Sequence, residues 1–138
     1  MEKKIATYIS ESKVLTLATC MNNVPYCANC FYVFDEENKI LIFLSSETTR
    51  HVAEALANNN VAGTIDKAVT TVAKIKGLQF TGEFIDPTEE QQKAFYKIYY
   101  HKFPFAKAKP SPVWAIKLNW LKMTDNTLGF GKKLKWER

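Results

Sequence analysis

The chain has 138 residues, the size of one compact domain. Its composition is 46% hydrophobic and 13% aromatic, which can fill one core and excludes a disordered chain. The longest apolar run, Ile40–Leu44, is far shorter than the ~20 residues of a membrane helix. The first residues are polar and no apolar leader follows them, so we expect a cytoplasmic protein without a membrane partner.

The net charge of +5 favours acidic partners such as a phosphate group, a nucleic acid or an anionic membrane. The simpler interpretation is a solvated lysine-rich surface, because lysine is rarely buried. Much of the charge lies late in the chain: Lys102, Lys107, Lys109, Lys117, Lys122, Lys132, Lys133 and Lys135.

The first third of the chain predicts one helix and a three-stranded meander. Apolar residues spaced i, i+4 indicate a helix over Lys3–Ser12. Strands are then expected at Val14–Cys20, Pro25–Asp35 and Ile40–Ser45, joined by short polar turns. Such short connections make neighbouring strands antiparallel.

The middle of the chain predicts a second helix and two more strands. The helix is expected over Arg50–Asn59, with Val52 and Leu56 on its inner face. A strand follows at Val61–Lys67, and Val72–Ile85 is expected to form one long bent strand. This last segment contains Gly77 and Gly82, and glycine inside a strand often marks a bulge or a barrel corner.

The final third begins with a helix-start signal. Asp86–Glu89 places an aspartate as the N-cap, a proline at the first helical position and a glutamate at the third. The helix is expected to reach His101, and strands are expected at Val113–Thr124 and Lys132–Trp136. The inward-facing residues of these elements are predicted to be Phe95, Ile98, Tyr99, Trp114, Ile116 and Leu118.

The count of six or seven strands and three helices, with strands mostly adjacent in sequence, predicts the fold class. We expect a mainly β protein, an antiparallel barrel with peripheral helices, formed by residues 1–138 as one domain.

The cysteines do not predict a metal or disulfide site. Cys27 and Cys30 have redox or zinc spacing, with Cys20 nearby. On a strand, however, positions i and i+3 point to opposite faces about 10 Å apart, beyond disulfide reach. We therefore expect structural thiols in a reducing compartment and no metal.

The junction after the third strand is chemically unusual. Four hydroxyl residues precede Arg50, which lies on the first turn of its helix, where the macrodipole favours an acidic residue. A bound phosphate would resolve this conflict, because helical N–H groups, hydroxyls and a guanidinium would converge on it. A serine/threonine N-cap followed by an exposed arginine explains the same residues. The hydroxyl residues are Ser45, Ser46, Thr48 and Thr49.

Longer motifs carry a family resemblance. The segments VPYCANCFYVFD, TRH, VAGTI, IKGLQFTGE, PVWAIKL and KMTDNTLGFGKKLKW occur in this order across nearly the whole chain. They resemble the FMN-binding split barrels related to pyridoxamine 5'-phosphate oxidase, and most closely the uncharacterised YhbP-like subfamily. The resemblance implies a homodimer that holds two FMN molecules in clefts between its subunits.

The resemblance also implies site residues. Ser45, Thr49 and Arg50 occupy its phosphate-binding positions, with Ser46 in the same hydroxyl cluster. The flavin ring would lie along the second strand, largely against the backbone of Asn29, Cys30 and Phe31.

The C-terminal turn would reach the flavin from the partner subunit. Thr124 and Lys133 stand where the oxidases carry a ring-contacting tryptophan and an arginine, and Lys132 lies beside Lys133. A cation there would stabilise negative charge on the flavin. The oxidases' C-terminal arginine–histidine signature is absent and Gly129–Lys133 replaces it, which argues against pyridoxamine phosphate oxidation.

Three functions remain open from the sequence. The first is an FMN-dependent oxidoreductase with a nicotinamide donor, and the second is a flavin- or haem-binding carrier or sensor without turnover. The third, single-stranded nucleic-acid binding as in OB-folds, is disfavoured because most aromatic residues fall on inward-facing positions. His51 could donate a proton or bind haem, but a surface or cap histidine is the simpler interpretation, and His101 is expected to be structural.

Overall fold

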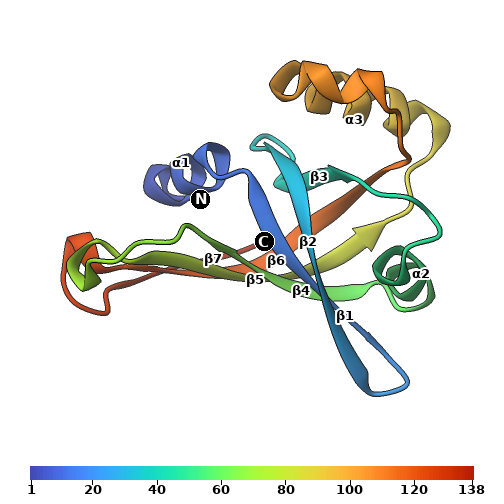
Figure 1. Ribbon diagram of the computed structural model, residues 1–138. Coiled ribbons are helices and arrows are strands. Elements are labelled where there is room, and N and C mark those ends of the chain that lie inside the picture. Colours follow the sequence, from blue (N-terminus) through green and yellow to red (C-terminus); the bar gives the residue numbers. More distant parts are fainter.

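The computed structural model describes residues 1–138 and contains one antiparallel seven-stranded sheet with three α-helices (Figure 1). The strand order is β3-β2-β1-β4-β5-β6-β7, and an additional β3–β6 pairing closes the first six strands into a ring. The elements are α1 (Lys3–Glu11), β1 (Val14–Met21), β2 (Val24–Asp35), β3 (Ile40–Leu44), α2 (Arg50–Ala57), β4 (Asn60–Asp66), β5 (Lys76–Ile85), α3 (Glu89–Lys102), β6 (Val113–Asp125) and β7 (Lys133–Glu137).

Strand β6 closes the barrel because its two halves have different partners. Its first half pairs with β3, from Leu44↔Val113 to Ile40↔Lys117. Its second half pairs with β7, and β5 lies along the other edge of both halves. The predicted antiparallel split barrel with peripheral helices is thereby confirmed.

The barrel interior and the outer face under α3 form two separate cores. Strand β3 is a continuous apolar run because both of its faces are buried: Leu41 and Phe43 point into the barrel, and Ile40 and Ile42 pack towards α3. Helices α1 and α2 both contribute buried side chains to the barrel core: Ile5, Ala6, Tyr8, Ile9, Val52 and Ala55.

Helix α3 packs on the outside of β2, β3 and β6 and lies over the outer core (Figure 1). Phe95 and Tyr99 are buried there as predicted, whereas Ile98 is only half-buried. Trp114, Ile116 and Leu118 are buried in the barrel core, which confirms the predicted inward face of β6.

Several predicted boundaries are wrong. The N-cap of α3 is Thr88, not Asp86: the Thr88 hydroxyl accepts from Gln91 N and the Gln91 side chain accepts from Thr88 N. Two overlapping capping patterns compete here, and the buried Pro87 stays outside the helix. Residues 72–74 form a 3₁₀ turn, so the long strand begins at Lys76. Helix α2 ends at Ala57, and Asn60 already belongs to β4.

Two side-chain assignments also differ from expectation. Leu56 is 46% exposed, and Ala55 takes the predicted inner position beside Val52. The register shift of β5 falls at Gly82, which confirms a bulge there, whereas Gly77 pairs regularly with Thr124. No helix combines the length and apolarity that a membrane crossing requires.

Candidate functional site

The segment 45–51, here called the strand–helix junction, joins β3 to α2 and is stabilised by its own hydroxyl groups. The Thr49 hydroxyl caps α2 by accepting from Val52 N at 3.4 Å and donates to Ser46 O at 2.8 Å. The exposed Ser46 hydroxyl lies 2.9 Å from the Thr48 hydroxyl. The Ser46 and Thr48 hydroxyls therefore lie together, whereas the Thr49 hydroxyl is engaged as the helix cap.

His51 belongs to this hydroxyl network, which the sequence interpretation missed. Its Nε2 lies 2.6 Å from Ser45 Oγ and 3.5 Å from Thr49 Oγ1. The side chain is half-buried, and burial lowers the pKa of the imidazole below its usual value. Trp114 fixes the other side of Ser45, because its indole Nε1 donates to Ser45 O at 2.9 Å.

Arg50 is held by two contacts from outside the junction. Its Nε donates to Glu54 Oε2 at 2.6 Å, and its guanidinium lies 4.1 Å from the centre of the Tyr26 ring. Glu54 is buried, and its other oxygen accepts from the Thr19 hydroxyl on β1 at 3.3 Å. The arginine side chain remains 54% exposed, and its hydrogen bonds within the chain involve Nε alone. The two Nη groups are therefore available to an external acceptor.

The sequence predicts only part of this network of contacts around Arg50. Glu54 lies four residues after Arg50, the helical spacing at which opposite charges meet. Tyr26 and Thr19 lie on the β1–β2 hairpin, and only the tertiary structure brings them to α2.

The predicted segment of β2, Asn29–Phe31, alternates between the two faces of the sheet. The Asn29 carboxamide oxygen accepts from the Thr16 hydroxyl at 2.9 Å, and the Phe31 ring is 61% exposed. Cys30 points into the barrel core, where burial raises the pKa of its thiol to about 11. Its side chain therefore faces the core and cannot contact a ligand on the outer face. Phe31 packs edge-on against Phe103, with ring centres 6.2 Å apart.

The C-terminal residues lie at the other end of the molecule. Thr124 and Lys133 are cross-strand neighbours, and Lys133 Nζ donates to Thr124 Oγ1 at 2.9 Å. The adjacent turn exposes Lys132 and the ring of Phe130, which is 88% exposed. Because β6 runs from the strand–helix junction to this turn, the two groups of residues are separated by up to about 35 Å of strand at roughly 3.3 Å per residue (Figure 1).

The cysteines are arranged as the strand geometry predicts. Cys27 is exposed and Cys30 is buried, so their side chains lie on opposite faces of β2, and all three cysteines are free thiols. No three His, Cys, Asp or Glu side chains are grouped so that they could hold a metal ion.

Solved structures share this fold at low sequence identity. A heme binding protein from Mycobacterium smegmatis superposes with a TM-score of 0.79 at 15% identity, covering 95% of this chain and 55% of that one. The heme storage protein HutZ from Vibrio cholerae superposes with a TM-score of 0.68 at 16% identity, and the match covers 99% of this chain and 93% of that one. A FAD-binding protein from Mesorhizobium loti superposes with a TM-score of 0.69 at 14% identity, covering 89% of this chain and 94% of that one.

Sequence relatives are much closer. No family model matches the chain. The UPF0306 protein plu4501 of Photorhabdus laumondii is 43% identical over 134 residues, which is 97% of this chain and 94% of that protein. The UPF0306 protein YhbP of Salmonella paratyphi A is 42% identical over 134 residues, which is 97% of this chain and 91% of that protein. With this identity over almost its full length, the chain belongs to the UPF0306 (YhbP) family.

Proposed function

We propose that this protein binds FMN at the strand–helix junction and acts as a flavin-dependent oxidoreductase. The observation that supports this most directly is the orientation of Arg50. Glu54 and Tyr26 hold its guanidinium, and its two Nη groups form no hydrogen bond within the chain. A guanidinium with free N–H groups suits the geometry of a phosphate monoester.

The residues of the junction fit a phosphate group chemically. Hydroxyl donors are present at Ser46 and Thr48, both exposed, and the first turn of α2 contributes the positive end of a helix dipole. The one acid of the segment, Glu47, is exposed and forms no ion pair with Arg50. Arg50 keeps its own counter-ion, so phosphate binding would share the cation with Glu54.

The proposed site would be completed by a homodimer. Thr124 and Lys133 lie too far from Arg50 for one flavin to contact both groups within a single chain. Both groups can join the same cofactor only if the C-terminal turn comes from a second copy. A twofold dimer would then contain two identical sites.

A bound flavin would supply reversible two-electron transfer, for which a nicotinamide nucleotide is a suitable class of donor. The chain's own contributions are binding and charge. Arg50 would hold the phosphate, and Asn29 and Phe31 present an exposed strand face to the ring. Lys133 would supply an ammonium group to the flavin ring bound by the partner subunit. Its hydrogen bond to Thr124 orients this ammonium group.

Titration of the purified protein with FMN tests the proposal. We expect quenching of flavin fluorescence that saturates at one FMN per chain and a flavin absorption band that remains with the protein on gel filtration. NADH or NADPH should then bleach the flavin band faster with the protein than with free FMN. No saturable quenching at micromolar protein would refute the proposal.

Haem is the second candidate ligand, because two of the solved structures with this fold are named as a heme binding and a heme storage protein. In that case the protein would be a carrier or sensor without turnover. A Soret band that appears on haem titration and is unaffected by FMN would favour this alternative.

A further inference from the structure

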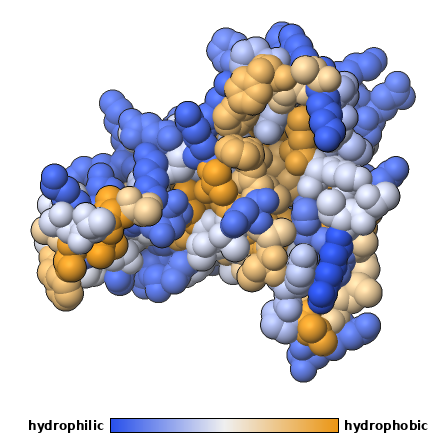
Figure 2. All heavy atoms as spheres, viewed as in Figure 1, coloured by the Kyte–Doolittle hydropathy of each residue, from blue (hydrophilic) through white to orange (hydrophobic).

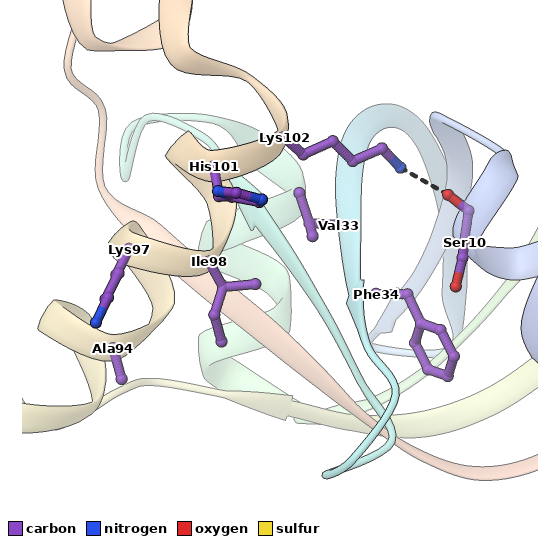
Figure 3. Close-up of a pocket in the computed structure, with 8 residues that line it drawn as sticks. All are labelled: Ser10, Val33, Phe34, Ala94, Lys97, Ile98, His101 and Lys102. Atoms are coloured by element: carbon purple, nitrogen blue, oxygen red, sulfur yellow. Dashed lines mark hydrogen bonds between the residues drawn. The ribbon is translucent and has the colours of Figure 1, made fainter.

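A groove of about 880 Å³ lies between α3, the end of β2 and the end of α1, away from the strand–helix junction. Helix α3 contributes one face to it, at the helical spacing i, i+3, i+4, i+7, i+8. Figure 3 shows His101 and Lys102 extending from α3 towards β2 and α1, whereas Lys97 points away from them. The volume is in the usual range for small-molecule sites. The groove is lined by Ser10, Val33, Phe34, Ala94, Lys97, Ile98, His101 and Lys102.

The lining combines an apolar floor with basic groups. Val33 and Ile98 form the floor under α3, Phe34 lies on the opposite face of β2, and no acidic side chain lines the groove. Its ionisable groups are Lys97, His101 and Lys102, all on α3. Figure 2 shows apolar surface between α3 and the α1 side of the molecule. The groove is therefore complementary to a molecule with an apolar body and a negative end.

Lys102 crosses from α3 to α1 at the edge of the groove (Figure 3). Its Nζ donates to Ser10 O at 3.1 Å and to Ser12 O at 2.9 Å, the carbonyl groups at the end of α1. An ammonium group has three donors, so one remains for an external acceptor. Burial lowers the pKa of Lys102, and the nearby Lys13 and Lys67 lower it further. A bound anion would offset the part of this shift that the two neighbouring lysines cause.

We propose that this groove binds an amphipathic carboxylate of the medium-chain fatty acid class. The alkyl chain would lie on Val33 and Ile98, and the carboxylate would pair with Lys102. None of the junction residues 45–51 lines this groove, so the proposal is independent of flavin binding.

Decanoate is the probe, and calorimetry with ¹⁵N chemical-shift mapping is the measurement. We expect one saturable site, with shift changes confined to the ends of α1, β2 and α3. Decanol, which has the same chain without the charge, should bind at least about tenfold more weakly, because a hydrogen bond to a charged group is worth about 1.5–3 kcal/mol.

Variants on α3 locate the site. Ile98→Glu places a carboxylate on the half-buried floor and should abolish binding. Lys97→Gln should change binding by less than about twofold, because Lys97 is exposed and points away from Lys102 (Figure 3). Lys93→Gln is the matched control, because Lys93 is exposed on the same helix but does not line the groove.

Lys102→Gln should weaken binding about tenfold or more. Lys102 also links α3 to α1. The binding result for this variant therefore counts only if the variant has the circular dichroism spectrum and melting curve of the wild type. Ile98→Glu does not remove that link and so tests the site separately.

Three results would overturn the proposal: equal binding of decanol and decanoate, wild-type binding by Ile98→Glu, or shift changes centred on other elements. Concentration-dependent protection of the groove amides without ligand would also overturn it, since a second copy of the chain would then be the occupant.

Discussion

Arg50 and Glu54 form an ion pair with 2.6 Å between Nε and Oε2, and the two side chains differ sharply in exposure, at 54% and 8%. The sequence placed a cation against the positive end of a helix dipole and predicted an anion to compensate. The structure supplies one such anion from the next turn of the same helix. Glu54 then links this arginine to β1 through the Thr19 hydroxyl.

Removing the buried acid should destabilise the fold. In Glu54→Ala the Thr19 hydroxyl loses its carboxylate partner, and we expect a loss of about 1–3 kcal/mol in the free energy of unfolding. The ion pair itself contributes little of this, because Arg50 is largely solvated. Urea denaturation measures the loss. The control is Glu47→Ala, an exposed acid without an ion pair, which should change stability by less than about 0.5 kcal/mol. Equal effects of the two variants would contradict the structural role of Glu54.

Arg50→Ala should weaken FMN binding about ten- to hundredfold, since a charge-assisted hydrogen bond to phosphate is worth about 1.5–3 kcal/mol. Riboflavin lacks the phosphate and should bind the variant and the wild type alike. Fluorescence titration of both flavins gives the comparison, and Arg50→Lys should restore part of the FMN affinity. If both flavins weaken equally, Arg50 acts through the fold and not through the phosphate.

Mixing two defective variants tests whether one site uses residues from two copies. Arg50→Ala and Lys133→Ala should each bind FMN weakly. In a mixed dimer one site carries both substitutions and the other carries neither. After the subunits exchange at equal amounts, about a quarter of all sites should therefore regain wild-type affinity. A mixture that binds as the simple average of its two parents would show that each site is built within one chain.

His51 should make stability depend on pH. Burial lowers the pKa of the folded histidine, so the unfolded chain, with a pKa near 6.5, binds the proton more readily. The contribution of His51 to stability is complete above the unfolded pKa near 6.5. It is lost as pH falls from there through the lower folded pKa. Urea midpoints measured at about pH 7.5 and about pH 5.5 should differ less in His51→Gln than in the wild type. His101→Gln, at the exposed end of α3, should leave the difference unchanged.

Gly63 should tolerate no side chain. A Cβ atom at this position would overlap the Thr16 carbonyl oxygen and the Phe80 ring, so β1 and β5 would have to move. We expect Gly63→Ala to lower the melting temperature and to cost about 1–3 kcal/mol. Gly77→Ala is the matched control on β5, since nothing lies within 4 Å of its added Cβ and the substitution should be neutral or slightly stabilising. A Gly63→Ala protein as stable as the control would contradict the packing described here.

The strands and helices were largely predictable because their signals are local. Alternating apolar residues identified β6, and the apolar run Ile40–Leu44 identified β3, whose burial on both faces the structure then showed. The start of α3 was placed two residues early because Asp86 and Thr88 both satisfy a capping pattern. In the structure the reciprocal hydrogen bonds between Thr88 and Gln91 identify Thr88 as the cap, and Pro87 is buried outside the helix.

The candidate site was predictable only in part. The sequence identified the hydroxyls and Arg50 of the junction, since they are neighbours in the chain. It missed His51 as the partner of Ser45, because a short hydrogen bond between them depends on how the junction turns. It also could not place Tyr26 against Arg50, because that contact requires the β1–β2 hairpin to reach α2.

The sequence by itself determined the antiparallel order of neighbouring strands, the helix periods and the clustering of basic and hydroxyl residues at one strand end, because each depends on residues a few positions apart. The tertiary structure decided which distant groups meet. Strand β6 changes partner from β3 to β7 along its length, which closes the barrel and carries Lys133 away from Arg50. Contacts such as Thr19 to Glu54 join residues far apart in the chain, and only the packing of the whole barrel brings them together.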